Sequence, residues 1–366
     1  SMLIGVDAKW FIKGPPGGHT YVQNILRSLL KQDGSNNYIL YCRRDDAAED
    51  FRIASERYRK KILSPNISFL RVRYALARAA LKDNLDILFT QSLAPKVKGI
   101  PKVVAIYDLL YKDFPQYFTW LEKKYFRFVD AAIREADAIV TISEYSKERI
   151  CHWFSADSKK IFITPCAADS RFHPINGSPQ LGALKIKYKL PQEFLLYIGR
   201  LNVRKNLPRV FQALKQSSCD LPLVCVGKKD WKSDPLDKII RDMGMKKRIL
   251  FTGYVLDEEL PLFMNLAAAF IYMPFGEGFG IPPLEALACG TPVVASRATA
   301  LPEVLGDAAL LADPCNIEEI AEHINRVTHD SVLRDNLRKK GIVRAACFSW
   351  DRSAQNLISL WQTLKK

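Results

Sequence analysis

The order of hydrophobic and polar residues predicts two successive α/β halves. Short apolar runs, typical of strands buried on both faces of a parallel sheet, alternate with stretches that repeat every three or four residues, as amphipathic helices do. In the first half we expect strands at 3–8, 38–42, 66–70, 86–90, 102–107, 138–143 and 160–165, and helices at 19–32, 72–82, 119–136 and 144–153. In the second half we expect strands at 194–199, 221–227, 249–254, 269–273, 292–296 and 309–312, and helices at 206–217, 235–243, 257–267, 282–289, 317–328 and 332–346. This alternation predicts two doubly wound parallel sheets covered by helices.

Domain boundaries follow from the breaks in this pattern. Residues 171–190 are rich in turn-forming residues and are the expected linker between a first domain at 1–170 and a second at 191–349. A last amphipathic helix is expected at 350–366, and 366 residues suit two domains of ordinary size. Folds of this class bind ligands at the carboxyl ends of their strands, so we expect the ligand in a cleft between the two domains.

The segment 273–296 is the most informative part of the chain. It reads MPFGEGFGIPPLEALACGTPVVAS and places Glu277 and Glu285 eight residues apart, with a glycine turn between two expected strands and a helix opened by Pro282 and Pro283. A glycine turn at a helix start presents main-chain N–H groups that suit anionic oxygens. Ionised carboxylates accept hydrogen bonds from hydroxyls. Amides for phosphate and carboxylates for sugar hydroxyls together predict a nucleotide-sugar site.

A second candidate element follows the expected strand 194–199. It reads Gly-Arg-Leu-Asn-Val-Arg-Lys-Asn and ends at Asn206, with Arg200 and Lys205 between a strand end and a helix start. The guanidinium of Arg200 offers a planar fork for phosphate oxygens, and Lys205 offers a point charge. A departing nucleoside diphosphate gains negative charge, so two fixed cations would stabilise the transition state more than the ground state. The alternative is an exposed ion pair.

A third candidate is the glycine loop Gly14-Pro-Pro-Gly17-Gly18 before the helix expected from His19. Glycines allow close approach of a phosphate to the main chain at a helix N-terminus. The loop lacks the Gly-x-Gly-x-x-Gly spacing, and strand 38–42 is followed by two arginines instead of an acid, so NAD binding is disfavoured. A simple flexible turn is the alternative, and His19 is a candidate active-site residue or a helix cap.

Two short segments of the sequence resemble motifs of a known family. Glu277 to Glu285 resembles the Glu-x7-Glu signature of the retaining family 4 glycosyltransferases, and Gly199 to Asn206 matches their Gly-Arg…Lys-Asn element. The resemblance implies the GT-B fold, in which two Rossmann-like domains face each other across a cleft and the last helix crosses back to the first domain.

The resemblance also implies roles for the candidate residues. Glu277, with main-chain amides near Gly278, Phe279 and Gly280, would hold the transferred sugar, and Glu285 would hold the ribose. Arg200 and Lys205 would grip the diphosphate, with Gly17 and Gly18 beside the pyrophosphate. By this reasoning the catalytic residues are Arg200, Lys205 and Glu277.

The strand expected at 102–107 ends in Tyr107-Asp108, where many relatives have His-Asp with the histidine near the reacting carbon. A phenol can donate a hydrogen bond but does not replace an imidazole near neutral pH. Tyr107 therefore opens the hypothesis of an altered activity, and Asp108 is a candidate contact to the acceptor hydroxyl.

The function implied is that of a bacterial, metal-independent retaining hexosyltransferase. The chain looks most like mannosyltransferases of O-antigen and exopolysaccharide assembly, so the expected donor is GDP-mannose and the expected acceptor is a lipid-linked or polysaccharide glycan. No cofactor is expected, and the five histidines lack metal-ligand spacing. The alternatives are another GT-B enzyme such as a sugar-nucleotide epimerase or a phosphorylase, a hydrolase that uses two carboxylates, and a non-catalytic nucleotide-sugar-binding protein.

Charge adds an expected partner to this interpretation. The net charge is +15, and residues 52–82 hold nine basic residues against the single acid Glu56. This basic window would attract an anionic inner-membrane surface, although a solvated surface is the alternative. The aromatic stretch 117–128 has helical spacing, which favours the core for most of its rings and leaves lipid contact open for some.

Other partners and the location follow from what the sequence lacks. Nothing matches a nucleic-acid-binding motif. No apolar run reaches the ~18 residues of a spanning helix. The eight cysteines form no Cys-x-x-Cys pair, which is typical of reduced thiols. The sequence thus predicts a cytoplasmic protein, peripheral at the cytoplasmic face of the inner membrane.

Overall fold

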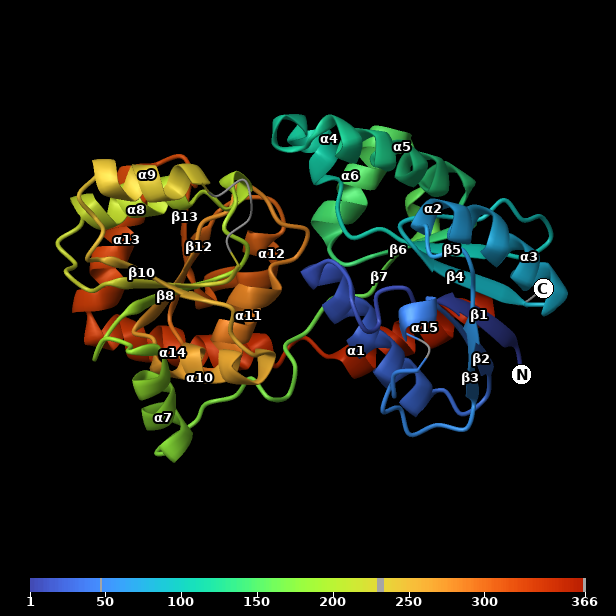
Figure 1. The fold of residues 1–366 in the computed structure, drawn as a ribbon, viewed down its shortest axis with the longest axis horizontal. Coiled ribbons are helices and arrows are strands. Elements are labelled where there is room, and N and C mark those ends of the chain that lie inside the picture. The colour runs from blue at the N-terminus through green and yellow to red at the C-terminus, as the bar shows by residue number, and fades with distance from the viewer. Residues whose placement is uncertain (47, 229–233, 365–366) are drawn as a thin grey trace. The chain divides into compact units, whose positions relative to one another are not determined.

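The computed structural model describes residues 1–46, 48–228 and 234–364, and it divides into two compact units. The first comprises Ser1–Cys166 and the chain from Ser349 onward, and the second comprises Ala167–Phe348. Each is built on a wholly parallel sheet with helices on its faces (Figure 1). The predicted doubly wound α/β class is therefore confirmed.

The first unit has a seven-stranded sheet in the order β3-β2-β1-β4-β5-β6-β7. Its strands are β1 (Leu3–Asp7), β2 (Asn37–Cys42), β3 (Tyr58–Ile62), β4 (Ile87–Gln91), β5 (Lys102–Ala105), β6 (Ala138–Thr141) and β7 (Ile161–Ile163). Its helical segments are α1 (Pro16–Gln32), α2 (Ser68–Leu70), η2 (Arg71–Leu76), α3 (Ala77–Lys82), α4 (Leu110–Asp113), α5 (Trp120–Glu135), α6 (Glu144–Phe154) and α15 (Trp350–Leu364).

One expected strand of this unit is wrong. Residues 66–70 do not form a strand, because the outer strand of the sheet is β3 and the chain turns at Pro65 into helix α2. β3 is an edge strand whose sequence, YRKKI, contains three basic residues, so it carries no apolar run that would reveal it. Basic side chains are a common protection of exposed sheet edges against further pairing.

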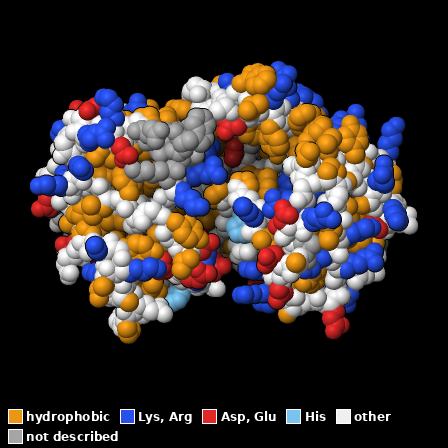
Figure 2. Space-filling view, viewed as in Figure 1, with side chains coloured by type: hydrophobic (Ala, Val, Ile, Leu, Met, Phe, Trp, Pro, Cys, Tyr) orange, Lys and Arg blue, Asp and Glu red, His pale blue; other side chains and the backbone are white. Residues whose placement is uncertain are grey.

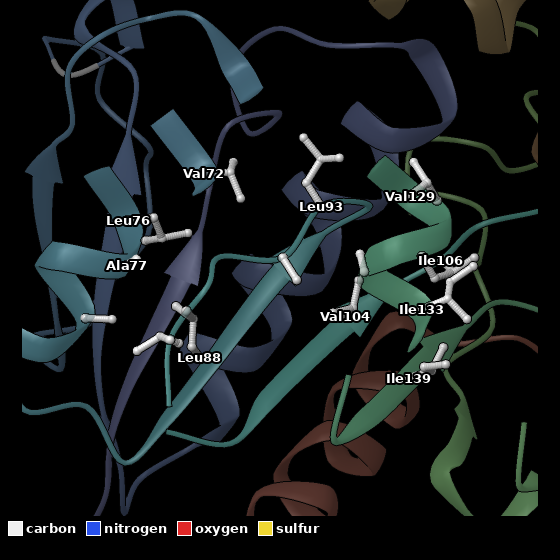
Figure 3. Packing of buried hydrophobic residues seen from close by; sticks show 14 of the residues in the cluster. Val72, Leu76, Ala77, Leu88, Leu93, Val104, Ile106, Val129, Ile133 and Ile139 are labelled. Atoms are coloured by element: carbon white, nitrogen blue, oxygen red, sulfur yellow. The ribbon is translucent and has the colours of Figure 1, made fainter. Parts of the chain in front are cut away.

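The core of the first unit lies between the sheet and the helices that cover it (Figure 3). Val129 and Ile133 of α5 belong to the same buried cluster as Val104 of β5 and the following Ile106, and all four are at most 4% exposed. Removing one such large side chain leaves a cavity and typically costs about 2–5 kcal/mol. Packing of this kind holds the carboxyl end of β5 in place, and that end carries Tyr107.

The last helix belongs to the first unit, as expected. α15 packs along α1, Trp361 lies edge-on to Phe89 of β4 with ring centroids 5.5 Å apart, and the hydroxyl of Ser353 donates to the Pro165 carbonyl at 2.6 Å. Residues 365–366 of the expected helix lie outside the described residues. The C-terminal segment therefore completes the domain formed by the start of the chain.

The second unit has a six-stranded sheet in the order β10-β9-β8-β11-β12-β13. Its strands are β8 (Leu195–Ile198), β9 (Leu223–Val226), β10 (Ile249–Gly253), β11 (Ala269–Tyr272), β12 (Val293–Ser296) and β13 (Leu310–Ala312). Its α-helices are α7 (Pro179–Tyr188), α8 (Leu207–Gln216), α9 (Asp234–Asp242), α10 (Leu260–Leu266), α11 (Ile281–Ala288), α12 (Leu301–Leu305), α13 (Ile317–His329) and α14 (Ser331–Ala345). α7 occupies much of the expected linker 171–190, so that segment is not irregular throughout.

The strand order decides where a ligand can bind in each sheet. The chain reverses its direction of growth between β1 and β4 in the first unit and between β8 and β11 in the second. At such a switch point the connections leave toward opposite faces, which opens a crevice at the carboxyl ends of the strands. The loops after β8 and β11 carry the two motifs singled out in the sequence.

Candidate functional site

The loop after β8 presents Lys205 from a short turn. Residues Val203–Lys205 form a 3-10 turn, and Asn206 then adopts a left-handed conformation with φ 61°, which asparagine tolerates better than most residues. Helix α8 begins immediately afterwards with Pro208 in its first turn. Lys205 is thus fixed at the junction of a strand end and a helix start, as the sequence predicts.

The loop after β11 presents Glu277 and ends in helix α11. Gly280 has φ 102°, and a Cβ at this position would lie 2.4 Å from Cδ2 of Leu301, so only glycine fits. The ring of Phe279 is buried and meets the Phe348 ring edge-on at 5.4 Å. The buried ring leaves the main chain of Phe279 as the part that a ligand could contact, and the role expected for its amide stays a prediction.

Hydrogen bonds join these two loops directly. The Asn206 side chain donates to the carbonyls of Met273 at 2.9 Å and Pro314 at 2.7 Å, and the Phe275 amide donates to the Arg204 carbonyl at 3.2 Å. Asn206 is 1% exposed, and losing a buried amide's partners costs about 1–3 kcal/mol. These bonds bring residues about 70 positions apart in sequence into one site.

At the centre of the site, Lys205 and Glu277 form an ion pair. The Lys205 ammonium also donates to the hydroxyl of Tyr272 at 3.2 Å, and that hydroxyl donates to Oε1 of Glu277 at 3.0 Å. Burial lowers the pKa of Lys205 against the opposing effect of Glu277. Burial alone would raise the pKa of Glu277, but the charges of Lys205 and Arg204 lower it below its usual value, so its carboxylate is ionised at neutral pH.

The main chain of Glu277 is fixed by Thr299, a residue that the sequence reasoning missed. The Thr299 hydroxyl accepts from the Glu277 amide at 2.8 Å and donates to the Glu277 carbonyl at 2.9 Å. Thr299 itself has φ 53°, an uncommon conformation for a β-branched residue. Strain of this kind is typical of positions that a functional site constrains.

The two arginines of the loop after β8 differ in exposure. Arg200 is exposed, and its positive charge contributes to the lowered pKa of Lys205. Arg204 is partly buried, and its positive charge helps to lower the pKa of Glu277. The site is therefore more cationic than the sequence motif alone indicated.

Glu285 lies in a different environment from Glu277, on the first turns of α11. Burial raises its pKa to about 8, with Arg171 opposing this effect and Asp169 and Asp257 adding to it. Near neutral pH the side chain is mainly protonated. The structure thus places the two motif glutamates in opposite protonation states.

In the first unit, the glycine loop forms the start of α1. Gly17 and Gly18 lie in the first helical turn, whose amides lack intrahelical acceptors. Gly17 has open space at its Cβ position, whereas a Cβ on Gly18 would lie 2.7 Å from the indole of Trp10. Trp10 therefore explains the glycine at 18 without a ligand, and the His19 ring bonds to the Trp10 carbonyl at 2.9 Å as a structural contact.

Tyr107 and Asp108, which follow β5, both make hydrogen bonds within the first unit. The Tyr107 hydroxyl donates to the Gln91 side chain, and burial raises its pKa well above its usual value. The phenol is therefore neutral and turned into the unit. A carboxylate oxygen of Asp108 accepts from the Leu110 amide at 2.9 Å, which fixes the turn into α4.

The same strand ends carry a buried charged cluster that the sequence did not reveal. Arg71 donates to Asp7 at 2.7 Å, and the ammonium of Lys9 lies 3.8 Å from the other Asp7 oxygen and donates to the Gln91 carbonyl at 2.7 Å. Burial lowers the pKa of Lys9 to about 8 against the opposing charge of Asp7. The only sequence signals were Asp7 and Lys9 at the end of an apolar strand.

The position of Arg71 in this cluster corrects the prediction that the basic residues of window 52–82 all lie on the surface. Arg71 is 1% exposed and belongs to the interior, not to the surface. Lys61 is paired with Asp83 at 2.7 Å, and Lys60 donates to the Glu49 carbonyl at 2.7 Å. The window is therefore less uniform than its sequence suggested, because three of its cations already have partners within the chain.

In the aromatic stretch 117–128, fewer apolar side chains are buried than its helical spacing predicted. Tyr125 and Phe126 pack against the core, but Trp120, Leu121 and Phe128 are exposed.

In the described part of the chain, no group of three His, Cys, Asp or Glu side chains is arranged to hold a metal ion. No described helix is both long and apolar enough to cross a membrane.

Comparison with known families gives two matches that together span most of the chain. Residues 16–172 match the family described as Glycosyltransferase Family 4, and residues 185–344 match Glycosyl transferases group 1. The second match contains Arg200, Lys205, Glu277 and Glu285.

Curated relatives carry mannosyltransferase names. The chain is 33% identical over 271 residues to the O-antigen chain mannosyltransferase B of Escherichia coli, covering 72% of this chain and 70% of that protein. It is 28% identical to the O-antigen chain mannosyltransferase RfbU of Salmonella typhimurium, covering 62% and 63%. It is 29% identical to the serotype-specific mannosyltransferase WbdA of E. coli, where the match covers 61% of this chain but only 28% of that longer protein.

Solved structures share the whole fold at low identity. Sucrose-phosphate synthase from Thermosynechococcus elongatus superposes with a TM-score of 0.80 at 19% identity, covering 100% of this chain and 99% of that one. Anabaena HepE in complex with UDP and glucose gives 0.76 at 18%, covering 99% and 100%. WaaG, a glycosyltransferase involved in lipopolysaccharide biosynthesis, gives 0.74 at 15%, covering 98% and 99%. These likenesses show the GT-B fold.

Proposed function

Because this chain belongs to the group 1 glycosyltransferases of the GT-B fold, we propose that it transfers mannose from GDP-mannose to a hydroxyl of a lipid-linked or polysaccharide glycan. The hexosyl transfer follows from the family and from the named relatives. The donor base, the sugar and the acceptor are the parts that we propose.

The observation that carries the proposal is the ion pair of Lys205 and Glu277 at the switch point of the second sheet. A cation and a carboxylate held side by side suit a donor in which a phosphate adjoins a hydroxyl-bearing sugar. Lys205, with Arg200 beside it, would bind the diphosphate, while Glu277 would accept hydrogen bonds from the sugar.

The chemistry follows from how charge moves during transfer. As the bond between the sugar and the diphosphate breaks, the leaving oxygen becomes more negative, and a cation fixed in advance stabilises this change without reorganisation. Because Lys205 is largely removed from water, its effect on that oxygen exceeds that of an exposed lysine. In our proposal a diphosphate oxygen takes the proton of the acceptor hydroxyl, and the configuration of the sugar is retained.

Glu285 would fix the ribose of the donor. Ribose hydroxyls donate hydrogen bonds best to an ionised carboxylate, so binding would favour loss of the Glu285 proton. The contacts expected from Gly17 and Gly18 to the pyrophosphate, and the absence of a metal requirement, stay predictions. Arg200 and Lys205 would supply the positive charge that a divalent ion supplies elsewhere.

Mannose and guanine are favoured by the relatives. The O-antigen mannosyltransferases named above are similar to this chain over most of its length. Their names suggest that the acceptor here is a growing glycan, and we place it at the cytoplasmic face of a membrane, with the exposed part of the basic window 52–82 near the anionic surface.

A donor screen tests this function. We expect thermal stabilisation by GDP-mannose above UDP-, dTDP- and ADP-sugars, and release of GDP when a mannose-terminated acceptor is added. The Glu277→Gln variant should bind the nucleotide but lose GDP release, while Glu258→Gln, an exposed glutamate of the same unit, should behave as the wild type.

The outcome also separates the alternative functions. Binding of GDP-mannose with no release of GDP under any acceptor would identify a nucleotide-sugar-binding protein. Conversion of the sugar without an acceptor would identify an epimerase. Preference for a UDP-sugar would overturn the donor while leaving hexosyl transfer in place.

A further inference from the structure

The helical segment from α2 through η2 to α3 is apolar on both of its sides. Its inner side packs Val72, Leu76 and Ala80 into the core of the first unit. Its outer side exposes Ile67, Leu70, Tyr74 and Leu81, and all but Leu70 are more than half exposed. Their spacings of three, four and seven residues place these four side chains along one stripe.

Helix α5 repeats this arrangement. Val129 and Ile133 face the core, whereas Trp120 is 66% and Leu121 69% exposed, and Phe128 is also exposed. A soluble helix normally presents polar residues on the side away from the core. Two neighbouring helical segments of the first unit thus break this rule in the same way.

The two segments form one continuous surface. The ring of Phe69, beside Leu70, packs on the ring of Phe128 with centroids 4.1 Å apart. Figure 2 shows hydrophobic side chains gathered over α2 and α5, with Lys and Arg side chains along their margin. We call the exposed apolar side chains of these segments the outer surface; they are Ile67, Leu70, Tyr74, Leu81, Trp120, Leu121 and Phe128.

Basic residues surround the outer surface, and acids are scarce there. No acidic residue occurs between Arg57 and Lys82, and Arg78 and Lys82 are exposed beside the stripe. On the first two turns of α5, Lys123, Lys124 and Arg127 are exposed. The single acid of the exposed turn, Glu122, is engaged by the Thr119 amide at the helix start.

One contact within the surface resembles an interfacial side-chain pair. The Lys124 ammonium lies 4.2 Å from the centre of the Trp120 ring. Tryptophan favours the boundary between water and hydrocarbon, and a lysine beside it can direct its charge toward headgroups while its methylenes stay in apolar surroundings. The pair is therefore suited to the headgroup region of a bilayer.

We propose that the outer surface inserts its apolar side chains into the headgroup–acyl boundary of an anionic phospholipid bilayer, with the surrounding lysines and arginines on the phosphates. Apolar side chains with a basic margin are the combination by which amphipathic helices bind such membranes, and one of these features alone binds weakly. A protein partner of the same chemistry would need acids facing these cations, and its capture is an outcome of the test below.

This inference deepens the proposed function by giving a lipid-linked acceptor a means of approach, and it goes beyond the basic window. Lys60 and Lys61 of that window are engaged by Glu49 and Asp83, so they contribute less than Arg78, Lys82, Lys123 and Lys124.

Flotation with vesicles tests the proposal on the full chain. We expect binding to vesicles of equal parts phosphatidylglycerol and phosphatidylcholine and little binding to pure phosphatidylcholine. Trp120→Glu with Leu121→Glu should reduce the bound fraction at least about tenfold, because it places two acids in the apolar surface. Arg78→Glu with Lys82→Glu should reduce it strongly, and Lys60→Glu with Lys61→Glu only a few-fold.

A matched control lies on α14 of the second unit, where Val332 and Val343 are each 69% exposed. Changing both to glutamate adds the same two negative charges and also removes exposed apolar side chains, and it should leave flotation unchanged. Equal loss with this control, wild-type flotation of the Trp120/Leu121 variant, or no vesicle binding by the wild type would each overturn the proposal. Capture of a protein partner that the same variant abolishes, without vesicle binding, would assign the surface to a protein.

Insertion has its own readout. Brominated lipids should quench the fluorescence of Trp120, measured as the difference between the wild type and Trp120→Phe, which keeps an apolar ring. Flotation uses neither donor nor acceptor, so a chain that floats but transfers no sugar would refute the proposed function and leave this inference intact. Transfer of sugar to a water-soluble glycan should survive in the Trp120/Leu121 variant.

Discussion

The carboxyl ends of the two sheets each carry an ion pair, but the two pairs differ in their exposure to solvent. In the second unit Lys205 and Glu277 pair where their side chains remain 10% and 17% exposed, so a ligand can reach them. In the first unit Asp7 and Arg71 pair at 0% and 1% exposure, with Lys9 beside them. A shared topology thus gives one edge suited to binding and another held by an internal ion pair.

The difference shows that the switch point of a parallel sheet determines where a ligand site can form. The residues at that point determine whether it binds a ligand or is filled by an internal ion pair. Buried pairs often stabilise little on balance, because removing both charges from water costs about as much as the pairing returns. Breaking such a pair is costly, however, since one charge is left alone. The comparison therefore predicts loss of activity from changes in the second unit and loss of stability from changes in the first.

The largest effect is expected from Glu277→Gln. This variant removes the carboxylate that we assign to the sugar while keeping its size, and kcat/KM should fall by about 10²–10³. The measurement is GDP release from GDP-mannose with a glycan acceptor, with Glu258→Gln as the control. Wild-type rates in the Glu277→Gln variant, with its fold verified by thermal denaturation, would remove Glu277 from the site.

Next comes Arg71→Met, which should destabilise the first unit by about 3 kcal/mol because Asp7 loses its close partner. Urea denaturation measures this change. Arg73→Met, at a partly exposed position of the same segment, should alter stability by less than about 0.5 kcal/mol. Adding Asp7→Asn to Arg71→Met should restore part of the loss, and an additive loss instead would contradict the pairing.

A pH-dependent effect of intermediate size is expected from Glu285, whose pKa is raised to about 8 from an ordinary 4.5. If the donor needs the ionised carboxylate, its dissociation constant should fall about tenfold per pH unit as the pH rises toward 8, and then level off. Calorimetric titration with GDP from pH 6 to 9 would show this slope. Glu285→Gln should give weaker binding without the slope, and an unchanged slope would assign it to another group.

The same group links pH to folding. The folded chain holds a proton that the unfolded chain releases, so this contribution to stability is fully present below pH 4.5 and is lost as the pH rises toward 8. Glu285→Gln should therefore flatten the decline in melting temperature over that range.

The smallest effect is expected from Tyr107→Phe. The Tyr107 hydroxyl donates to the side chain of the buried Gln91, so we expect it to contribute more to the stability of the first unit than to sugar transfer. We expect kcat to change less than about threefold, with modest destabilisation of about 1 kcal/mol from the lost hydrogen bond. A large fall in kcat at unchanged stability would give the phenol a catalytic role.

Local patterns predicted most of the fold. The strands of the second unit are mostly short apolar runs and helix α5 has a helical repeat, and they form where the sequence indicated. β3 was missed because an edge strand of lysine and arginine has no buried run, and α7 was missed because its proline and glycine content is typical of a linker. The motif residues of the second unit could be predicted because their spacing is characteristic: Glu277 and Glu285 stand eight residues apart, and Lys205 follows the Gly-Arg pair that ends at Arg200.

The sequence by itself determined the two α/β halves, the family, and the identity of Lys205, Glu277 and Glu285, because these depend on neighbours along the chain. Only the tertiary structure decided that Lys205 and Glu277 pair, that Glu285 keeps its proton, that Arg71 is interior and that Trp120 is exposed. Protonation and exposure are set by groups distant in sequence, through burial and charge, and no local pattern encodes those neighbours.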